Sequence, residues 1–135
     1  VVPESLVLAQ AANESGWGTS RFARQANNLF GVWCFSKGCG LTPKNRDEGL
    51  SHEVAKYESV QDGIVAYVHT INTNPAYIQL RHIRATTRSE EHHFSGHALA
   101  EGLLKYSSRG IDYVRDIQQL IRVNDLQKYT LPLQA

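Results

Sequence analysis

A single carboxylate stands where an apolar, helix-forming stretch gives way to a glycine-rich turn. Glu14 follows a run rich in alanine and leucine and precedes Gly16 and Gly18, which flank Trp17. Glycine adopts the backbone angles at which helices end, so Glu14 is expected near a helix C-terminus. The negative end of the helix dipole, together with partial burial against Trp17, would disfavour the ionised carboxylate. A carboxyl group that keeps its proton near neutral pH can serve as a general acid.

From its spacing in the sequence, Glu14 could equally be the last polar residue of an ordinary helix. The residues around it, however, form a more specific pattern. Residues 9–20 are Ala-Gln-Ala-Ala-Asn-Glu-Ser-Gly-Trp-Gly-Thr-Ser, residues 21–23 are Arg-Phe-Ala, and residues 27–31 are Asn-Asn-Leu-Phe-Gly. These motifs resemble the signature of the bacterial glucosaminidases, the peptidoglycan-cleaving glycoside hydrolase family 73, and more closely its bacterial Bax-type branch. The resemblance spans about Ser5 to Asn124 and implies that Glu14 is the catalytic acid.

Glycoside hydrolysis commonly uses a second carboxylate, which activates water or attacks directly, although in some families the N-acetyl group of the substrate attacks instead. The candidates are Asp47, Glu48 and Glu53, in a stretch without helical periodicity. The resemblance implies that the second acid lies on a β-lobe. Glu48 adjoins Gly49 at an expected turn tip and is our choice, with Glu53 as the fallback. On sequence alone Glu48 also fits a solvated turn residue.

Two tyrosines are further candidates for the site. Tyr106 precedes a turn that resembles the family's Gly-Tyr-Ala-Thr-Asp segment, and the resemblance implies that its hydroxyl orients water or the N-acetyl group. Lys105 replaces the glycine of that segment, so the match is partial. The alternative is a tyrosine that caps a helix end with its ring in the core. Tyr77 ends a segment that resembles the family's Asn-Pro-x-Tyr turn and is expected in a groove wall or in the core.

Sugar rings stack on aromatic side chains, and their acetamido groups need polar partners. Phe30, Trp33 and Tyr57 are expected at a groove wall, although any one of them is equally suited to the core. The amide of Asn28 can bind an acetamido group or cap its own turn. Trp17 and Phe22 are expected to pack beneath Glu14.

The two cysteines, Cys34 and Cys39, are separated by Phe-Ser-Lys-Gly. This spacing favours a disulfide across a glycine-containing turn, and hence an oxidising compartment, over a reduced pair or half of a metal site. The absence of a second cysteine pair argues against structural zinc. His93 and His97 are one helical turn apart, but the chain lacks a His-Glu-x-x-His motif, so we expect helix-surface histidines and no metal.

Composition limits the class of protein. The chain has 135 residues with 41% hydrophobic and 20% charged residues, which predicts one globular domain over residues 1–135. A net charge of +1 gives no strong attraction to nucleic acid. No apolar run reaches membrane-spanning length, and the start at Val1 indicates a processed domain. We expect a monomer in the periplasm or cell envelope.

Hydrophobic periodicity and capping signals predict a mainly helical α+β protein. A small extended lobe is expected around residues 52–57, where Val54 and Lys56 would face opposite ways to Ala55 and Tyr57. Arg84 to Arg88 is expected to be a loop. The predicted helices cover residues 3–15, 21–26, 60–71, 75–83, 90–104 and 112–123, with a further turn at 125–128. The predicted N-caps are Ser20, Ser59, Asn74 and Ser89. The resemblance implies a lysozyme-like arrangement with a small β-lobe.

The resemblance as a whole implies an endo-β-N-acetylglucosaminidase. Such an enzyme would cleave the β-1,4 bond between N-acetylglucosamine and N-acetylmuramic acid in peptidoglycan glycan strands, with Glu14 as general acid and no cofactor. A muramidase or a lytic transglycosylase is the alternative within the same class of enzyme. A wall-binding module that has lost catalysis is the alternative from a different class.

Overall fold

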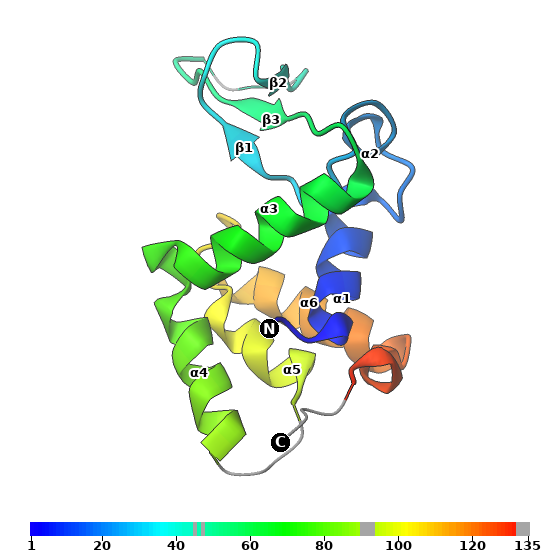
Figure 1. Ribbon diagram of the computed structural model, residues 1–135, viewed down its shortest axis with the longest axis vertical. Coiled ribbons are helices and arrows are strands. Elements are labelled where there is room, and N and C mark those ends of the chain that lie inside the picture. Colours follow the sequence, from blue (N-terminus) through cyan, green and yellow to red (C-terminus); the bar gives the residue numbers. More distant parts are fainter. Residues whose placement is uncertain (45, 47, 90–93, 132–135) are drawn as a thin grey trace. The chain divides into compact units, whose positions relative to one another are not determined.

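The computed structural model describes residues 1–44, 46, 48–89 and 94–131. The chain forms two compact units. The helical unit comprises Val1–Gln10 and Val68–Ala135, and the β unit comprises Ala11–Tyr67. Helices predominate, and the strands form one small antiparallel sheet (Figure 1), so the predicted α+β class is confirmed.

The β unit begins within helix α1 (Glu4–Ser15) and continues into the short helix α2 (Arg21–Ala26). Ser20 caps α2, because its hydroxyl accepts a hydrogen bond from the Ala23 N–H at 3.1 Å, as its position predicted. Asn27 ends the helix in the left-handed conformation with φ +54°. The boundaries predicted for both helices are therefore confirmed to within a residue.

The sheet is small and has β3 (Glu53–Ala55) at its centre, between β1 (Trp33–Cys34) and β2 (Gly40–Leu41) (Figure 1). Val54 pairs with Trp33 on one side and with Leu41 on the other. All three residues of β3 are buried. This strand falls in the extended segment predicted at residues 52–57, and both of its faces are covered, as is common for a central strand.

Helix α3 (Val60–Thr73) starts where Ser59 accepts a hydrogen bond from the Asp62 N–H at 3.0 Å, as the capping signal predicted. Gly63 lies in its first turns, against the chain that follows α2. A Cβ atom there would lie 2.6 Å from the carbonyl oxygen of Asn27. Glycine is therefore needed to let α3 approach this turn.

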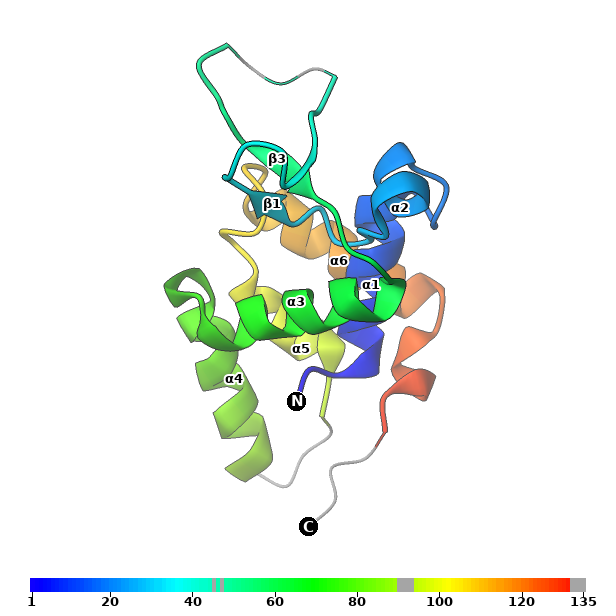
Figure 2. The same ribbon diagram turned by 45° about the horizontal axis from the view of Figure 1, so that its top comes forward.

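The helical unit is built from η1 (Pro75–Tyr77), α4 (Ile78–Ser89), α5 (Gly96–Leu99), η2 (Ala100–Gly102), α6 (Ile111–Val123) and η3 (Leu126–Tyr129). Helix α5 packs against both α4 and α6, which can be followed in Figure 2. Leu80, Leu99 and Leu103 are fully buried in this unit. A Cβ atom on Gly102 would lie 2.3 Å from Leu80 Cα, so η2 and α4 are in close contact.

Two predicted boundaries in this unit are wrong. The expected loop at residues 84–88 is helical, and α4 continues to Ser89. Arg84 is held by hydrogen bonds to Asn72 Oδ1 and to the Val1 carbonyl, at 2.7 and 2.9 Å. Ser89 ends α4 instead of starting a long helix, and the next helix is the short α5, capped by Ser95. Glu90 and Glu91 lie outside the described residues.

Among the residues that the structure describes, no helix combines the length and apolar character that crossing a membrane would require.

Candidate active site

Glu14 occupies the last turn of α1 and is half-buried. The chain then reverses through Gly16, Trp17 and Gly18, all with positive φ, at +58°, +58° and +84°. The hydroxyl of Ser15 donates to the Ala11 carbonyl and accepts a hydrogen bond from the Gly18 N–H at 2.8 Å. This turn fixes the backbone beside Glu14.

The carboxylate of Glu14 lies against Gly31. A Cβ atom placed on Gly31 would lie 3.2 Å from Glu14 Oε2 and 3.8 Å from its Cδ. Gly31 has φ +69°, which a residue with a side chain rarely adopts. The two halves of the sequence pattern, around Glu14 and at residues 27–31, are therefore in contact in the fold.

Trp17 does not pack beneath Glu14, and that prediction is wrong. Its side chain is 62% exposed, because the left-handed backbone of the turn directs it outward. Phe22 is half-buried and lines a pocket of about 360 Å³ with Arg21, Pro43 and Lys44. The guanidinium carbon of Arg21 lies 4.9 Å from the centroid of the Phe22 ring.

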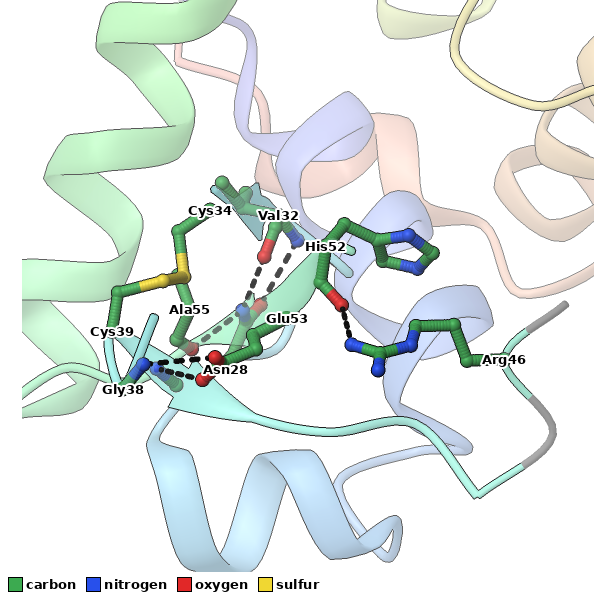
Figure 3. The surroundings of a disulfide bond; sticks show 10 residues. Asn28, Val32, Cys34, Gly38, Cys39, Arg46, His52, Glu53 and Ala55 are labelled. Atoms are coloured by element: carbon green, nitrogen blue, oxygen red, sulfur yellow. Dashed lines mark hydrogen bonds between the residues drawn. A yellow bond between two sulfur atoms is a disulfide. The ribbon is translucent and has the colours of Figure 1, made fainter. Parts of the chain in front are cut away.

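Asn28 is buried, and its amide is occupied by the backbone of the β unit (Figure 3). Its nitrogen donates to the carbonyls of Val32 and Ala55 at 3.0 and 2.9 Å. Its oxygen accepts hydrogen bonds from the N–H groups of Phe30 and Val32 at 3.2 and 3.3 Å. Of the two roles left open by the sequence, the geometry supports the turn cap.

The predicted groove-wall aromatics differ in exposure. Phe30 is 1% exposed and stacks on Tyr67 with ring centroids 4.0 Å apart, so its ring belongs to the core. Tyr57 is half-buried, its ring faces Gly63, and burial raises the pKa of its phenol. Trp33 is 52% exposed and presents ring surface to solvent.

Trp33 rests on a buried histidine, His52, which no sequence motif marks as a site residue. The rings of Trp33 and His52 stack with centroids 3.5 Å apart and planes 10° apart. The carbonyl of His52 accepts a hydrogen bond from Arg46 at 3.0 Å (Figure 3). Trp33 pairs with Val54 in the sheet. Position 52 lies two residues before Val54 and is therefore a diagonal neighbour of Trp33, which only the strand register reveals.

Glu53 is buried and holds the disulfide turn. Its carboxylate accepts hydrogen bonds from the N–H groups of Gly38 and Gly40, at 2.9 and 3.0 Å (Figure 3). These two bonds, with smaller contributions from nearby Arg46 and Lys37, hold the pKa of Glu53 below its usual value. Glu53 is therefore an ionised structural carboxylate in this geometry.

The disulfide predicted between Cys34 and Cys39 is present, with the two Cα atoms 6.3 Å apart. The bond closes the turn whose N–H groups bind Glu53, and Figure 3 shows the two features side by side. The covalent link and the buried carboxylate thus stabilise the same segment of the β unit.

Glu48 is exposed and lies beside Gly49, which has φ +86°. No hydrogen bond to a described residue ties its side chain in place in the way that Glu53 is tied. Asp47, the third candidate carboxylate, lies outside the described residues.

Tyr77 and Tyr106 belong to the helical unit. Tyr106 is half-buried, with its ring centroid 5.8 Å from that of Tyr77 and 5.5 Å from that of Tyr113. Tyr113 accepts a hydrogen bond from Gln10 at 3.0 Å. Tyr77 is buried, so it contributes to the packing that fixes the ring of Tyr106.

Within the described part of the chain, no three His, Cys, Asp or Glu side chains are grouped so that they could hold a metal ion. His97 is exposed on α5, while His92 and His93 lie outside the described residues.

The chain belongs to the glucosaminidase family. The family model, described as mannosyl-glycoprotein endo-beta-N-acetylglucosaminidase, matches residues 1–126. The resemblance stated from the motifs is therefore confirmed.

Curated relatives include both a bax protein and flagellar hydrolases. Protein bax of Escherichia coli strain K12 is 38% identical over 84% of this chain and 39% of its own length. Peptidoglycan hydrolase FlgJ of the same strain is 36% identical over 56% of this chain and 28% of its own length. Peptidoglycan hydrolase FlgJ of Vibrio parahaemolyticus is 38% identical, also over 56% of this chain and 28% of its own length. The chain thus spans well under half of each of these relatives, and no solved structure gives a significant match.

Proposed function

We propose that this chain is the catalytic domain of a peptidoglycan hydrolase. The proposed activity is that of an endo-β-N-acetylglucosaminidase, which cleaves the β-1,4 bond between N-acetylglucosamine and N-acetylmuramic acid. The family description and the FlgJ relatives, which are named peptidoglycan hydrolases, support the class of reaction. The observation that carries the assignment to a residue is the half-buried carboxylate of Glu14, set at a helix end against Gly31.

In this proposal Glu14 is the general acid. Its proton passes to the bridging oxygen as the glycosidic bond breaks and positive charge develops at the anomeric carbon. Glu14 lies in the last turn of α1 and is half-buried, and the proposed reaction requires its carboxyl group to carry a proton when the glycan binds. This chemistry requires no cofactor.

Glu48 is the proposed second carboxylate. Glu53, the fallback, is buried and accepts hydrogen bonds from two backbone N–H groups of the disulfide turn. Moving its carboxylate toward a sugar would break both hydrogen bonds. Glu48 is exposed at a turn and has no such engagement with the described residues, which is why it is preferred to Glu53 in this proposal. If the N-acetyl group of the substrate attacks instead, Glu48 is not needed.

Trp33 is the proposed stacking surface for a sugar ring. Its indole is half-exposed and supported from behind by His52, which holds it in one orientation. Tyr106 is retained as a proposed orienting residue, because Tyr77 and Tyr113 hold its ring.

The proposed location is the periplasm or cell envelope, where peptidoglycan is found. The Cys34–Cys39 disulfide fits an oxidising compartment. We propose a monomer, because Glu14, Glu48 and Trp33 all come from Ala11–Tyr67 of one chain.

The experiment that tests this proposal is digestion of purified cell-wall sacculi, with mass spectrometry of the products. A reducing N-acetylglucosamine end is the expected result. A reducing muramic acid end would identify a muramidase, and an anhydro-muramyl end a lytic transglycosylase. Binding to sacculi without any bond cleavage would overturn the proposal in favour of a wall-binding module.

A further inference from the structure

The Glu14 carboxylate lies beside Gly31, in the space that a side chain at position 31 would need. The separation of 3.2 Å between Glu14 Oε2 and the site of a Gly31 Cβ is shorter than ordinary van der Waals contact, which begins near 3.4 Å. Any side chain at position 31 would therefore compete with the carboxylate for the same space.

We propose that Gly31 is a positioning residue for Glu14. Its missing side chain provides the space that the carboxylate occupies, and its backbone forms the wall against which the carboxylate rests. The inference rests on the proposed role of Glu14 as general acid. It goes further by assigning a function to the last residue of the Asn-Asn-Leu-Phe-Gly segment.

The wall formed by Gly31 is held on both sides. Phe30 and Val32, its chain neighbours, each donate a backbone N–H to the side-chain oxygen of Asn28. The Val32 carbonyl also accepts a hydrogen bond from the Asn28 nitrogen, and the Phe30 ring stacks on Tyr67. A side chain added to Gly31 would therefore meet a backbone that cannot retreat.

Glu14 is the partner that would move. Its own backbone is fixed by the hydrogen bonds of Ser15 and the turn through Gly18, so the displacement falls on the rotatable side chain. Proton transfer depends on the position of the acid relative to the scissile oxygen. A shift of about 1 Å in a reacting group can cost about a hundredfold in rate.

Backbone strain must be separated from the contact with Glu14, and the chain offers a matched control. Gly38 has φ +85°, but a Cβ atom there would have nothing within 4 Å. Gly38→Ala therefore carries the left-handed backbone penalty without touching Glu14. Gly31→Asn is the complementary variant, because asparagine tolerates left-handed angles, as Asn27 does, yet carries a Cβ atom.

The experiment compares wild type, Gly31→Ala, Gly31→Asn, Gly38→Ala and Glu14→Gln for thermal stability and for glycan cleavage. Gly31→Ala and Gly38→Ala should lose stability to a similar extent. The kcat of both Gly31 variants should fall by about 10-fold to about 100-fold with KM within about threefold, while Gly38→Ala stays within about threefold of wild type. In spectra of protein with ¹³C-labelled glutamate, the Glu14 side-chain carboxyl signal should move in both Gly31 variants and stay in place in Gly38→Ala.

The outcomes distinguish the inference from the proposed function. A folded wild type without glycan cleavage, or a fully active Glu14→Gln, removes the proposed function. If wild type is active and Glu14→Gln is not, full activity in a folded Gly31→Asn overturns the positioning role. An unmoved Glu14 carboxyl signal in that variant overturns it independently of turnover.

Discussion

Trp33 and His52 form a stacked pair with ring centroids 3.5 Å apart, in which the indole is half-exposed and the imidazole is 7% exposed. The buried ring supports the exposed one, so the outer face of Trp33 is presented without the entropy cost of ordering a mobile side chain.

Trp33→Ala should therefore weaken glycan binding. We expect the Kd for a chitooligosaccharide to rise about tenfold, equivalent to about 1.4 kcal/mol, because the apolar sugar face loses its stacking partner. Calorimetric titration measures this effect. Phe35→Ala is the matched control, since Phe35 is an exposed aromatic close in sequence, 73% exposed. Equal weakening by both variants, or by neither, would count against a specific role for Trp33.

Glu48→Gln should lower kcat by about a hundredfold if Glu48 is the second carboxylate, because the substitution removes the negative charge and the base. Stability should hardly change, since the side chain is exposed. Steady-state cleavage assays and a thermal melt check both expectations. Unchanged kcat would remove Glu48 from the mechanism and leave its role to Glu53, to Asp47 or to the N-acetyl group of the substrate.

Glu53 should make stability depend on pH. Its pKa is lowered in the folded protein, so its stabilising contribution is complete above the ordinary glutamate pKa of about 4.3. The contribution is lost as the pH falls through the lower, folded-state pKa. Glu53→Gln should therefore lower Tm at pH 7, with a difference from wild type that shrinks below about pH 4. Glu58→Gln, at an exposed glutamate in the same unit, should show neither effect.

The Cys34–Cys39 bond should give only modest stability, because it closes a short loop with a sequence separation of 5. Replacing both cysteines by serine should cost about 2 kcal/mol in urea denaturation. A thiol-reactive label should fail on the native protein and react after reduction. Ready labelling of both thiols before reduction would contradict the disulfide and the oxidising compartment with it.

Capping residues in the sequence identified the starts of α2, α3 and η1 correctly, whereas the helix start predicted at Ser89 was wrong. Ser20 and Ser59 cap helices in the structure as predicted, and Asn74 caps η1, because each bond joins residues only two or three apart. The segment from residue 84 to 104 was misassigned, since distant contacts decide it. Arg84 binds groups at residues 1 and 72, and Gly102 packs on Leu80.

The position of Glu14 was predictable from the sequence, but its contacts were not. The motif located Glu14 at the end of a helix, which the structure confirms. The approach of Gly31 to its carboxylate joins two turns far apart in sequence, and no local pattern encodes such a contact. Likewise, the outward direction of Trp17 follows from positive φ values in the turn. The hydrogen bonds from Gly38 and Gly40 to the Glu53 carboxylate depend on the sheet register.

The most direct test of the account is one comparison of reducing-end release from purified sacculi. Glu14→Gln keeps the shape of the side chain but removes its transferable proton, whereas Glu58→Gln makes the same change at an exposed position. We predict that Glu14→Gln loses about a hundredfold or more of the activity while Glu58→Gln retains it. Equal activity in wild type and a folded Glu14→Gln would contradict the central claim that Glu14 supplies the proton.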